Sequence, residues 1–144
     1  MAAFPLAVSQ NAYQREKSTE TALHEVFSYI EAGMVTYGAV MATLIDILGA
    51  FNNTPHDAID NGARDHGING TIRLWLGEYL KHRYVVSEHG FSNLSGKVSR
   101  GCPQGGVLSP KLWCLTVNKL LTMLEKAGIK EFDYSDDIII LTQG

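Results

Sequence analysis

The order of apolar and polar residues predicts a helix and then a buried strand in the first third of the chain. Four apolar residues recur at the spacing of one helix face between residues 18 and 33, namely Leu23, Val26, Phe27 and Ile30. Ser18 or Thr19 can cap the start of this helix, and Gly33 can close its end. The next run, GAVMATLID, is apolar and β-inclined, and it predicts a central strand that ends near Asp46.

The middle of the chain predicts two helices and a hairpin. Residues 54–67 predict a helix that Thr54 caps and that Gly62 weakens from inside. Residues 71–83 place five apolar or aromatic side chains on one helix face: Ile72, Trp75, Leu76, Tyr79 and Leu80. Two short strand-like runs flank Gly90 and predict a hairpin, which the loop RGCPQGG follows.

The last third predicts one long helix and a second hairpin. The helix has Ser109 as its cap and runs to Gly128, with an apolar stripe of four leucines: Leu112, Leu115, Leu120 and Leu124. Two short strands, IKEFDY and IIILTQ, follow it, and their junction holds Asp136 and Asp137. The predicted hairpin spans residues 129–142, has this junction at its tip and packs on the helix. No internal repeat or linker divides the chain, so the sequence predicts one domain of mixed α and β structure.

Composition narrows the functional classes only a little. The 144 residues carry a formal net charge of −3 and a pI of about 5.9, which does not indicate the basic face that nucleic-acid binders usually carry. The two cysteines, Cys102 and Cys114, match no zinc or redox spacing, so we expect reduced thiols. The start lacks the basic region of a signal peptide, and no apolar run is long enough to span a bilayer. We therefore expect a protein of the cytoplasm or nucleus.

The adjacent aspartates are the first candidate for chemistry. Aspartate is a poor strand residue, and two neighbouring carboxylates repel each other. A divalent cation would offset that repulsion, and carboxylate oxygens select Mg²⁺ or Mn²⁺ over softer metals. Asp46 ends another apolar strand, so Asp46, Asp136 and Asp137 are candidates for a shared site with two metal ions. Each part also has a plain structural interpretation, because Asp-Asp is often a turn and Asp46 often a helix cap or a solvated carboxylate.

Three short stretches stand in a fixed order along the chain. They are LIDILGAFNN, which contains Asp46, Ala50 and Phe51; RGCPQGGVLSP, residues 100–110; and YSDD, residues 134–137. Together they resemble motifs A, B and C of the reverse transcriptase domain of non-LTR (LINE-like) retrotransposons, in the form typical of animal and especially insect elements. SQNAYQREKSTETAL resembles a worn form of the family's segment before motif A, usually Gln-aromatic-Gly-Phe-Arg and then Gly-Arg-Ser. The resemblance covers nearly the whole chain.

The resemblance implies an α+β fold, a right-hand polymerase palm in which helices back an antiparallel sheet. In this interpretation residues 1–35 are a remnant of the fingers, residues 36–144 are the palm, and the chain stops before the thumb. The implied activity is that of an RNA-directed DNA polymerase (reverse transcriptase), which transfers a nucleotide onto a primer 3′-hydroxyl with two metal ions. The implied cofactor is Mg²⁺, with Mn²⁺ as a substitute, and the implied partners are an RNA template, a DNA primer and dNTPs.

The resemblance also implies roles for the residues of motifs A and C. Asp46 and Asp136 would bridge the two metals, and Asp137 would support the second carboxylate. The backbone carbonyl of Ile47 would complete one coordination sphere. Phe51 would block a ribose 2′-hydroxyl, because its ring fills that space, although a core role stays open for a buried aromatic residue.

Motif B and the start of motif C would contact the substrates. Arg100, Gln104 and Gly105 would help to position the template and the incoming nucleotide, and the small glycines would let the backbone approach the substrate closely. Tyr134 and Ser135 would lie near the primer end. As for Phe51, a plain core role stays open for Tyr134.

Departures from the family pattern leave other interpretations open. Ser135 replaces the usual alanine, Leu48 stands where Glu or Lys is common, and Ala12 and Glu16 replace two glycines. A catalytically inactive, decayed retroelement remnant is therefore one alternative. An RNA-directed RNA polymerase palm is another, although Phe51 argues against it because such an enzyme must admit the 2′-hydroxyl. A plain α/β interaction domain would leave motif B unexplained.

Overall fold

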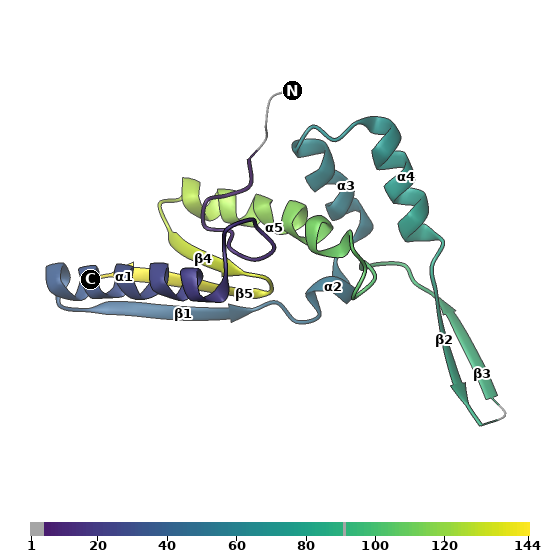
Figure 1. Ribbon diagram of the computed structural model, residues 1–144, viewed down its shortest axis with the longest axis horizontal. Coiled ribbons are helices and arrows are strands. Elements are labelled where there is room, and N and C mark those ends of the chain that lie inside the picture. Colours follow the sequence, from purple (N-terminus) through teal and green to yellow (C-terminus); the bar gives the residue numbers. More distant parts are fainter. Residues whose placement is uncertain (1–4, 91) are drawn as a thin grey trace.

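A three-stranded antiparallel sheet in the strand order β1-β5-β4 forms the centre of the fold (Figure 1). The computed structural model describes residues 5–90 and 92–144. In chain order the elements are α1 (Thr19–Tyr37), β1 (Val40–Asp46), α2 (Ala50–Asn53), α3 (His56–Asp65), α4 (Gly70–Lys81), β2 (Tyr84–His89), β3 (Ser92–Lys97), α5 (Ser109–Lys126), β4 (Lys130–Tyr134) and β5 (Asp137–Gln143). The predicted α+β class and order of elements are confirmed, and the short helix α2 is the one addition.

The run of isoleucines in β5 exists because helices cover both faces of the sheet. Ile138 and Ile140 pack with α5 in one apolar cluster, whereas Ile139 and Leu141 pack with α1 in another. Successive side chains of a strand point to opposite faces, so a strand between two helices is apolar throughout. Accordingly, α5 and α1 lie on opposite sides of the sheet (Figure 1).

The hairpin that carries the paired aspartates forms as predicted. Tyr134 at the end of β4 lies opposite Asp137 at the start of β5, which leaves Ser135 and Asp136 as a two-residue turn. Ser135 has a φ of 65°, and the tightest hairpin turns need a positive φ at one or both central residues. The turn therefore fixes Asp136 at the tip, next to the end of the sheet.

Helix α1 is longer than predicted. Ser18 caps its start in a capping box, as expected, but the helix passes Gly33 and ends at Tyr37. Gly38 is the C-cap and has a left-handed φ of 81°. Gly33 instead permits close packing of the helix on β1, because a Cβ there would lie 2.6 Å from Cγ2 of Val40.

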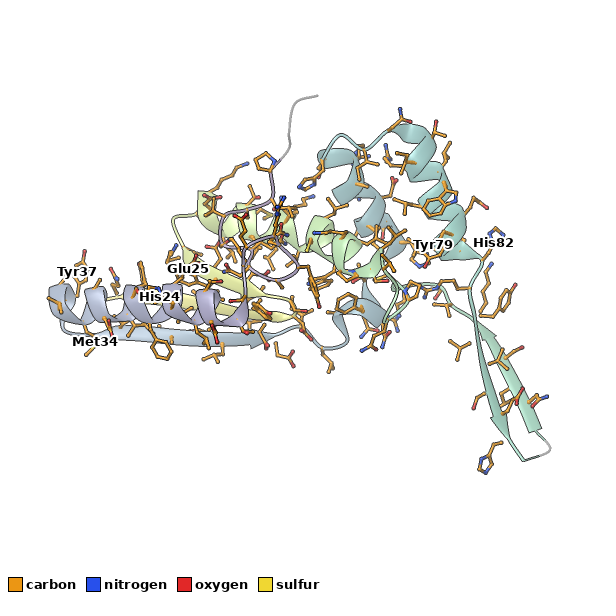
Figure 2. All side chains as sticks on the ribbon, viewed as in Figure 1. His24, Glu25, Met34, Tyr37, Tyr79 and His82 are labelled. Carbon is orange, nitrogen blue, oxygen red and sulfur yellow. The ribbon has the colours of Figure 1, made fainter. Side chains whose placement is uncertain are left out.

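The buried face of α1 is narrower than its apolar pattern predicts. Val26 is 7% exposed, but Leu23 and Phe27 are 52% and 58% exposed. Met34 and Tyr37, near the end of the helix, are also exposed (Figure 2). The helix covers only part of the sheet face, so the apolar residues on its flanks stay accessible.

Two predicted N-caps are wrong. Helix α3 has Pro55 as its N-cap. The hydroxyl of Thr54 does not cap this helix, because it donates to the carbonyl of Ala50 in α2. Helix α5 has Leu108 at the N-cap, and Ser109 is its first residue. The Ser109 hydroxyl donates to the carbonyl of Pro103 at 2.5 Å, so it ties the preceding loop to the helix.

Two predicted apolar faces also differ in part. In α4, Leu76 and Leu80 are buried, but Ile72 and Trp75 are more than half exposed. In α5, Leu120 is 42% exposed. The buried residues of α5 are Leu112, Trp113, Cys114, Val117 and Leu121, along with Ser109 at its start. This face is wider than the leucine stripe because α5 packs on the sheet and on α3 at once.

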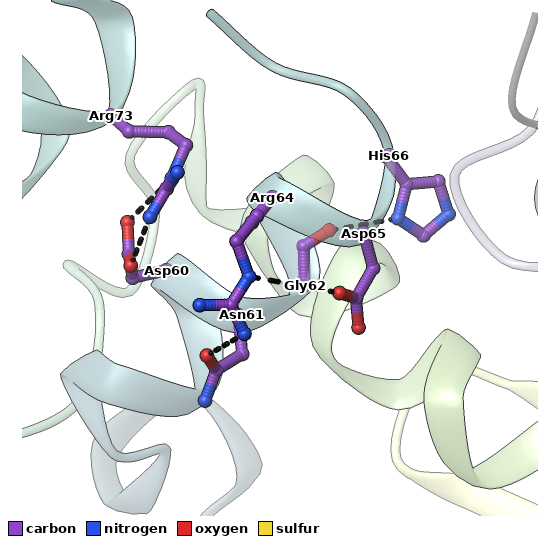
Figure 3. A network of polar contacts seen from close by, with 7 residues as sticks. All are labelled: Asp60, Asn61, Gly62, Arg64, Asp65, His66 and Arg73. Carbon is purple, nitrogen blue, oxygen red and sulfur yellow. Dashed lines mark hydrogen bonds and ion pairs between the residues drawn. The ribbon is translucent and has the colours of Figure 1, made fainter. Parts of the chain in front are cut away.

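Helix α3 packs on α5, and α4 packs on α3. Gly62 of α3 lies so close to α5 that a Cβ there would be 2.5 Å from the carbonyl oxygen of Leu115. Arg73 of α4 donates to both carboxylate oxygens of Asp60 in α3, at 2.8 and 2.5 Å (Figure 3). This contact holds the pKa of Asp60 below its usual value.

Strands β2 and β3 form a hairpin that projects from the rest of the molecule (Figure 1). They pair with each other in a separate two-stranded sheet. All six side chains of β2 are exposed, as are those of residues 93–97 in β3. Within the described residues, no helix has the length and apolar character needed to cross a membrane.

Candidate active site

Strands β1 and β5 bring the aspartates of two distant motifs to the same end of the sheet. Asp46 lies opposite Asp137 in the antiparallel register, 91 positions later in the chain. Residues opposite each other in such a pair have Cα atoms about 4.5–5.5 Å apart and side chains on the same face. Asp136 follows in the turn, and its carbonyl accepts a hydrogen bond from the N–H of Ile47 at 3.0 Å. The backbone pairing therefore brings the three aspartates to the same end of the sheet.

The donor atoms at this sheet end suit a hard divalent cation. All three aspartates offer carboxylate oxygens, and Asp46 and Asp137 are exposed while Asp136 is half-buried. Among the described residues, no three Asp, Glu, His or Cys side chains form a ready set of metal ligands. Asp46 and Asp137 extend from paired strands, and Asp136 extends from the adjoining turn. The Ile47 carbonyl accepts from the N–H of Ala50 at 3.1 Å and retains a second lone pair.

Phe51 lies in α2, directly after the strand that carries Asp46, and is half-buried. Its ring meets Tyr13 edge-on, with centroids 6.3 Å apart, and packs tilted on Trp113 at 5.9 Å. The same ring borders two apolar clusters. One lies between the sheet and α5, and the other lies among α3, α4 and α5. Phe51 is thus a core residue on one side and accessible on the other.

The motif B loop lies against α2. The N–H of Cys102 donates to the carbonyl of Phe51 at 2.7 Å, and that of Gly101 donates to Thr54 at 2.6 Å. A Cβ on Gly101 would lie 2.6 Å from the Phe51 carbonyl oxygen, and the φ of Gly101 is +78°, so only glycine fits there. This glycine therefore allows the loop to approach the backbone of α2 closely.

The other motif B residues form an accessible rim. Arg100, Gln104 and Gly105 are exposed, and nothing lies within 4 Å of a Cβ built on Gly105. Arg83, which the sequence did not single out, donates to the carbonyls of Gly101 at 3.1 Å and Arg100 at 3.4 Å. A basic residue at the foot of the projecting hairpin thereby orients the loop.

Two aromatic residues outside the predicted set hold the tip of the carboxylate hairpin. The hydroxyls of Tyr13 and Ser135 lie 2.9 Å apart, and Nε1 of Trp113 donates to the Ser135 carbonyl at 2.6 Å. Tyr134, before the tip, is half-buried. The only sequence signal for Tyr13 was its place in the worn segment before motif A, and Trp113 stands just after motif B.

A buried carboxyl group lies behind this tip. Asp133 of β4 is 2% exposed, and the N-terminal segment pairs with it, since Asn11 donates to its carbonyl at 3.0 Å. Within the described part of the chain, its Oδ1 has no hydrogen-bond partner. Burial, and then the charges of Asp136 and Glu131, raise the pKa of Asp133 to about 7.

Both cysteines are free and buried, as the sequence predicted for reduced thiols. Burial raises the pKa of Cys102, and it raises that of Cys114 to about 11. Neither thiol is therefore a nucleophile at neutral pH.

Comparisons with known proteins agree with this geometry. Residues 6–144 match the family of the reverse transcriptase (RNA-dependent DNA polymerase). The chain is 29% identical, over 94% of its length, to a putative 115 kDa protein in the type-1 retrotransposable element R1DM of Drosophila melanogaster. It is 32% identical, over 89% of its length, to a Pol polyprotein from the type-1 element R1 of Bradysia coprophila. The chain spans only 13% and 12% of these two relatives.

Solved structures show the same fold at low sequence identity. Apo telomerase from Candida tropicalis superimposes with a TM-score of 0.66 and 12% identity, over 94% of this chain and 28% of that one. Telomerase from Candida albicans, in complex with a fragment of telomeric RNA, gives 0.59 and 11%, over 94% and 27%. The antiparallel sheet with its helices is thus a polymerase palm, and with 139 of 144 residues matched, the chain belongs to the reverse transcriptase (RNA-dependent DNA polymerase) family.

Proposed function

We propose that this chain is the catalytic palm of an RNA-directed DNA polymerase, with residues 36–144 as the palm and residues 1–35 as part of the fingers. The single observation that carries the proposal is the β1–β5 register, which sets Asp46 opposite Asp137 and beside the turn that holds Asp136. The partners are an RNA template, a DNA primer and dNTPs. The family match does not favour an RNA-directed RNA polymerase, an inactive remnant or an interaction domain.

In this proposal Asp46 and Asp136 would hold two Mg²⁺ ions, or Mn²⁺ in their place. Asp137 would support the second carboxylate, and the Ile47 carbonyl, which keeps a free lone pair, would be a further oxygen ligand. When bound, such ions activate a 3′-hydroxyl and stabilise the leaving pyrophosphate. Oxygen donors alone favour these hard cations over zinc or copper.

Phe51 excludes the ribose 2′-hydroxyl, because its ring stands just beyond the strand that carries Asp46. The exposed rim of Arg100, Gln104 and Gly105 contacts the template and the incoming nucleotide. Tyr134, at the end of β4, and Ser135, in the turn, lie next to the primer end in this arrangement. The exposure of the rim and the half-burial of Phe51 are what such contacts require.

Mn²⁺ binding tests the metal site directly. Free Mn²⁺ is followed by electron paramagnetic resonance during titration of the chain, with Mg²⁺ as competitor. We expect Asp46→Asn and Asp136→Asn each to weaken binding on the order of tenfold or more, because each removes a ligand charge. Asp65→Asn, which neutralises an exposed carboxylate at the end of α3, is the control and should bind like the wild type (Figure 3). Equal affinity in all four proteins, or no binding by any, would overturn the proposal.

A further inference from the structure

Four residues from four separate parts of the chain close a ring of contacts around the hairpin tip. We call this ring the aromatic circuit; its members are Tyr13, Phe51, Trp113 and Ser135. Tyr13 belongs to the N-terminal segment, Phe51 to α2, Trp113 to α5 and Ser135 to the turn between β4 and β5. Each member contacts the next, and the last contacts the first.

Two hydrogen bonds and two ring contacts make up the circuit. The Tyr13 and Ser135 hydroxyls are 2.9 Å apart, and the Ser135 carbonyl accepts from Trp113 at 2.6 Å. The Trp113 and Phe51 ring centroids are 5.9 Å apart, and Phe51 returns to Tyr13 at 6.3 Å with an interplanar angle of 85°. Edge-to-face and tilted pairs at such distances are favourable arrangements of aromatic rings.

Both residues of the hydroxyl contact, Tyr13 and Ser135, have a backbone conformation that is rare outside glycine. Among the described residues, three that are not glycine have a positive φ, and two of them are Tyr13 at 58° and Ser135 at 65°. Such conformations are unfavourable for residues other than glycine and persist where the surroundings enforce them. Lys111 adds to that enforcement, because its Nζ donates to the Tyr13 carbonyl at 2.6 Å.

We propose that Tyr13 is a positioning residue that fixes the hairpin tip relative to Phe51 through this circuit. The inference rests on the proposed polymerase function, in which Asp136 at the tip holds metal and Phe51 meets the sugar. A metal-bound triphosphate and its ribose keep a fixed separation, so both protein groups must be held at a matching distance. Misplacement by about 1 Å can cost on the order of a hundredfold in rate.

The hydroxyl of Ser135 connects the hairpin tip to Tyr13 in this arrangement. Serine stands here in place of the alanine that is usual in the family, and an alanine could not form a hydrogen bond with the Tyr13 hydroxyl. Tyr13 is 43% exposed, so burial alone does not fix its position. The paired hydroxyls therefore supply the directional contact that links the N-terminal segment to the tip.

Fluorescence of Trp113 tests the role of Tyr13 without requiring catalysis. The chain has two tryptophans, and Trp75→Phe removes the exposed one. Mn²⁺ is paramagnetic, so its binding near the tip should quench Trp113, and the titration gives an affinity. We expect Tyr13→Phe and Ser135→Ala each to weaken Mn²⁺ binding about three- to fivefold, the equivalent of one net hydrogen bond. The double variant should be no weaker than either single variant, because both remove the same contact.

Tyr37→Phe is the matched control, since it removes an exposed hydroxyl at the far end of α1 (Figure 2). It should leave the affinity unchanged. Melting temperatures of all variants, measured without divalent ions, establish that each is folded; Tyr13→Phe keeps the ring contact with Phe51. Absence of quenching in the Trp75→Phe chain would overturn the polymerase proposal itself. Quenching with equal affinity in every variant, or additive losses in the double variant, would overturn the role of Tyr13 and leave the metal site standing.

Discussion

Asp133 is the residue at which burial and charge conflict most strongly. It belongs to β4 of the carboxylate hairpin and is 2% exposed, and its pKa is raised to about 7 from an ordinary 3.8. Because the folded protein prefers the neutral acid there, it binds more protons than the unfolded chain between about pH 4 and pH 7. The free energy of unfolding must therefore fall as the pH rises through this window and level off above it.

Asp133→Asn should remove this pH dependence. The shift corresponds to a loss on the order of 4 kcal/mol from pH 4 to above pH 7, at about 1.4 kcal/mol per unit. An uncharged carboxamide of the same shape carries no such penalty, so the variant should be the more stable protein at pH 8. Urea unfolding at several pH values from 4 to 8, without divalent ions, measures the slope. Asp65→Asn should keep the slope of the wild type, and an equally steep slope in Asp133→Asn would show that another group is responsible.

Phe51→Val should relax the choice of sugar in an active polymerase that contains this chain. A phenyl ring collides with a 2′-hydroxyl but not with a 2′-hydrogen, and shortening the side chain removes the clash while the aspartates stay in place. We expect the preference for dNTPs over rNTPs to fall on the order of tenfold or more, with a modest loss of dNTP activity. Single-nucleotide primer extension with each triphosphate measures the ratio.

Phe51→Tyr is the control for that experiment. It keeps the ring and should keep the preference for dNTPs. The ring also packs on Trp113 and Tyr13, so the valine variant loses contact area. If Phe51→Val reduced dNTP and rNTP incorporation equally, Phe51 would be a packing residue only.

At the scale of elements, glycines decide how closely the helices pack. Gly62→Ala should destabilise the protein by about 1–3 kcal/mol, because the new Cβ would meet the backbone of α5. Gly77→Ala in α4 should instead stabilise it, by up to about 1 kcal/mol, because nothing lies within 4 Å and alanine favours a helix. Chemical denaturation of both variants gives the comparison, and a neutral or stabilising Gly62→Ala would contradict the tight α3–α5 contact.

Elements with local sequence signals could be predicted, whereas features that depend on tertiary contacts could not. The carboxylate hairpin and β1 were predictable, because apolar runs and an interruption by two polar aspartates are local signals. The caps at Thr54 and Ser109 were wrong because tertiary partners use those hydroxyls. The link between Tyr13 and Ser135 spans 122 positions, and no local rule connects an exposed tyrosine with a turn serine.

At the scale of the whole molecule, the 144-residue chain by itself should not extend a primer. Its relatives are far longer, and much of the rate of such a reaction comes from holding the substrates in place. Primer extension is measured with the chain alone and with a fusion to the region that follows in a homologous element. Activity of the fusion alone would show that the chain cannot hold its substrates, whereas inactivity of both would indicate a defective palm. Incorporation of dNTPs above background by the chain alone would contradict this expectation.

The β1–β5 pairing has a consequence for the synthesis of the protein. Among the described strands, β1 pairs only with β5, and Asp46 must wait for a partner 91 positions downstream. At a ribosomal rate of about 5–20 residues per second, that wait lasts roughly 5 to 20 s. Throughout it, an apolar strand with Met41, Leu44 and Ile45 remains unpaired, which is the condition under which nascent chains aggregate or recruit chaperones. Slow codons placed between the two strands should therefore lower the yield of correctly folded protein.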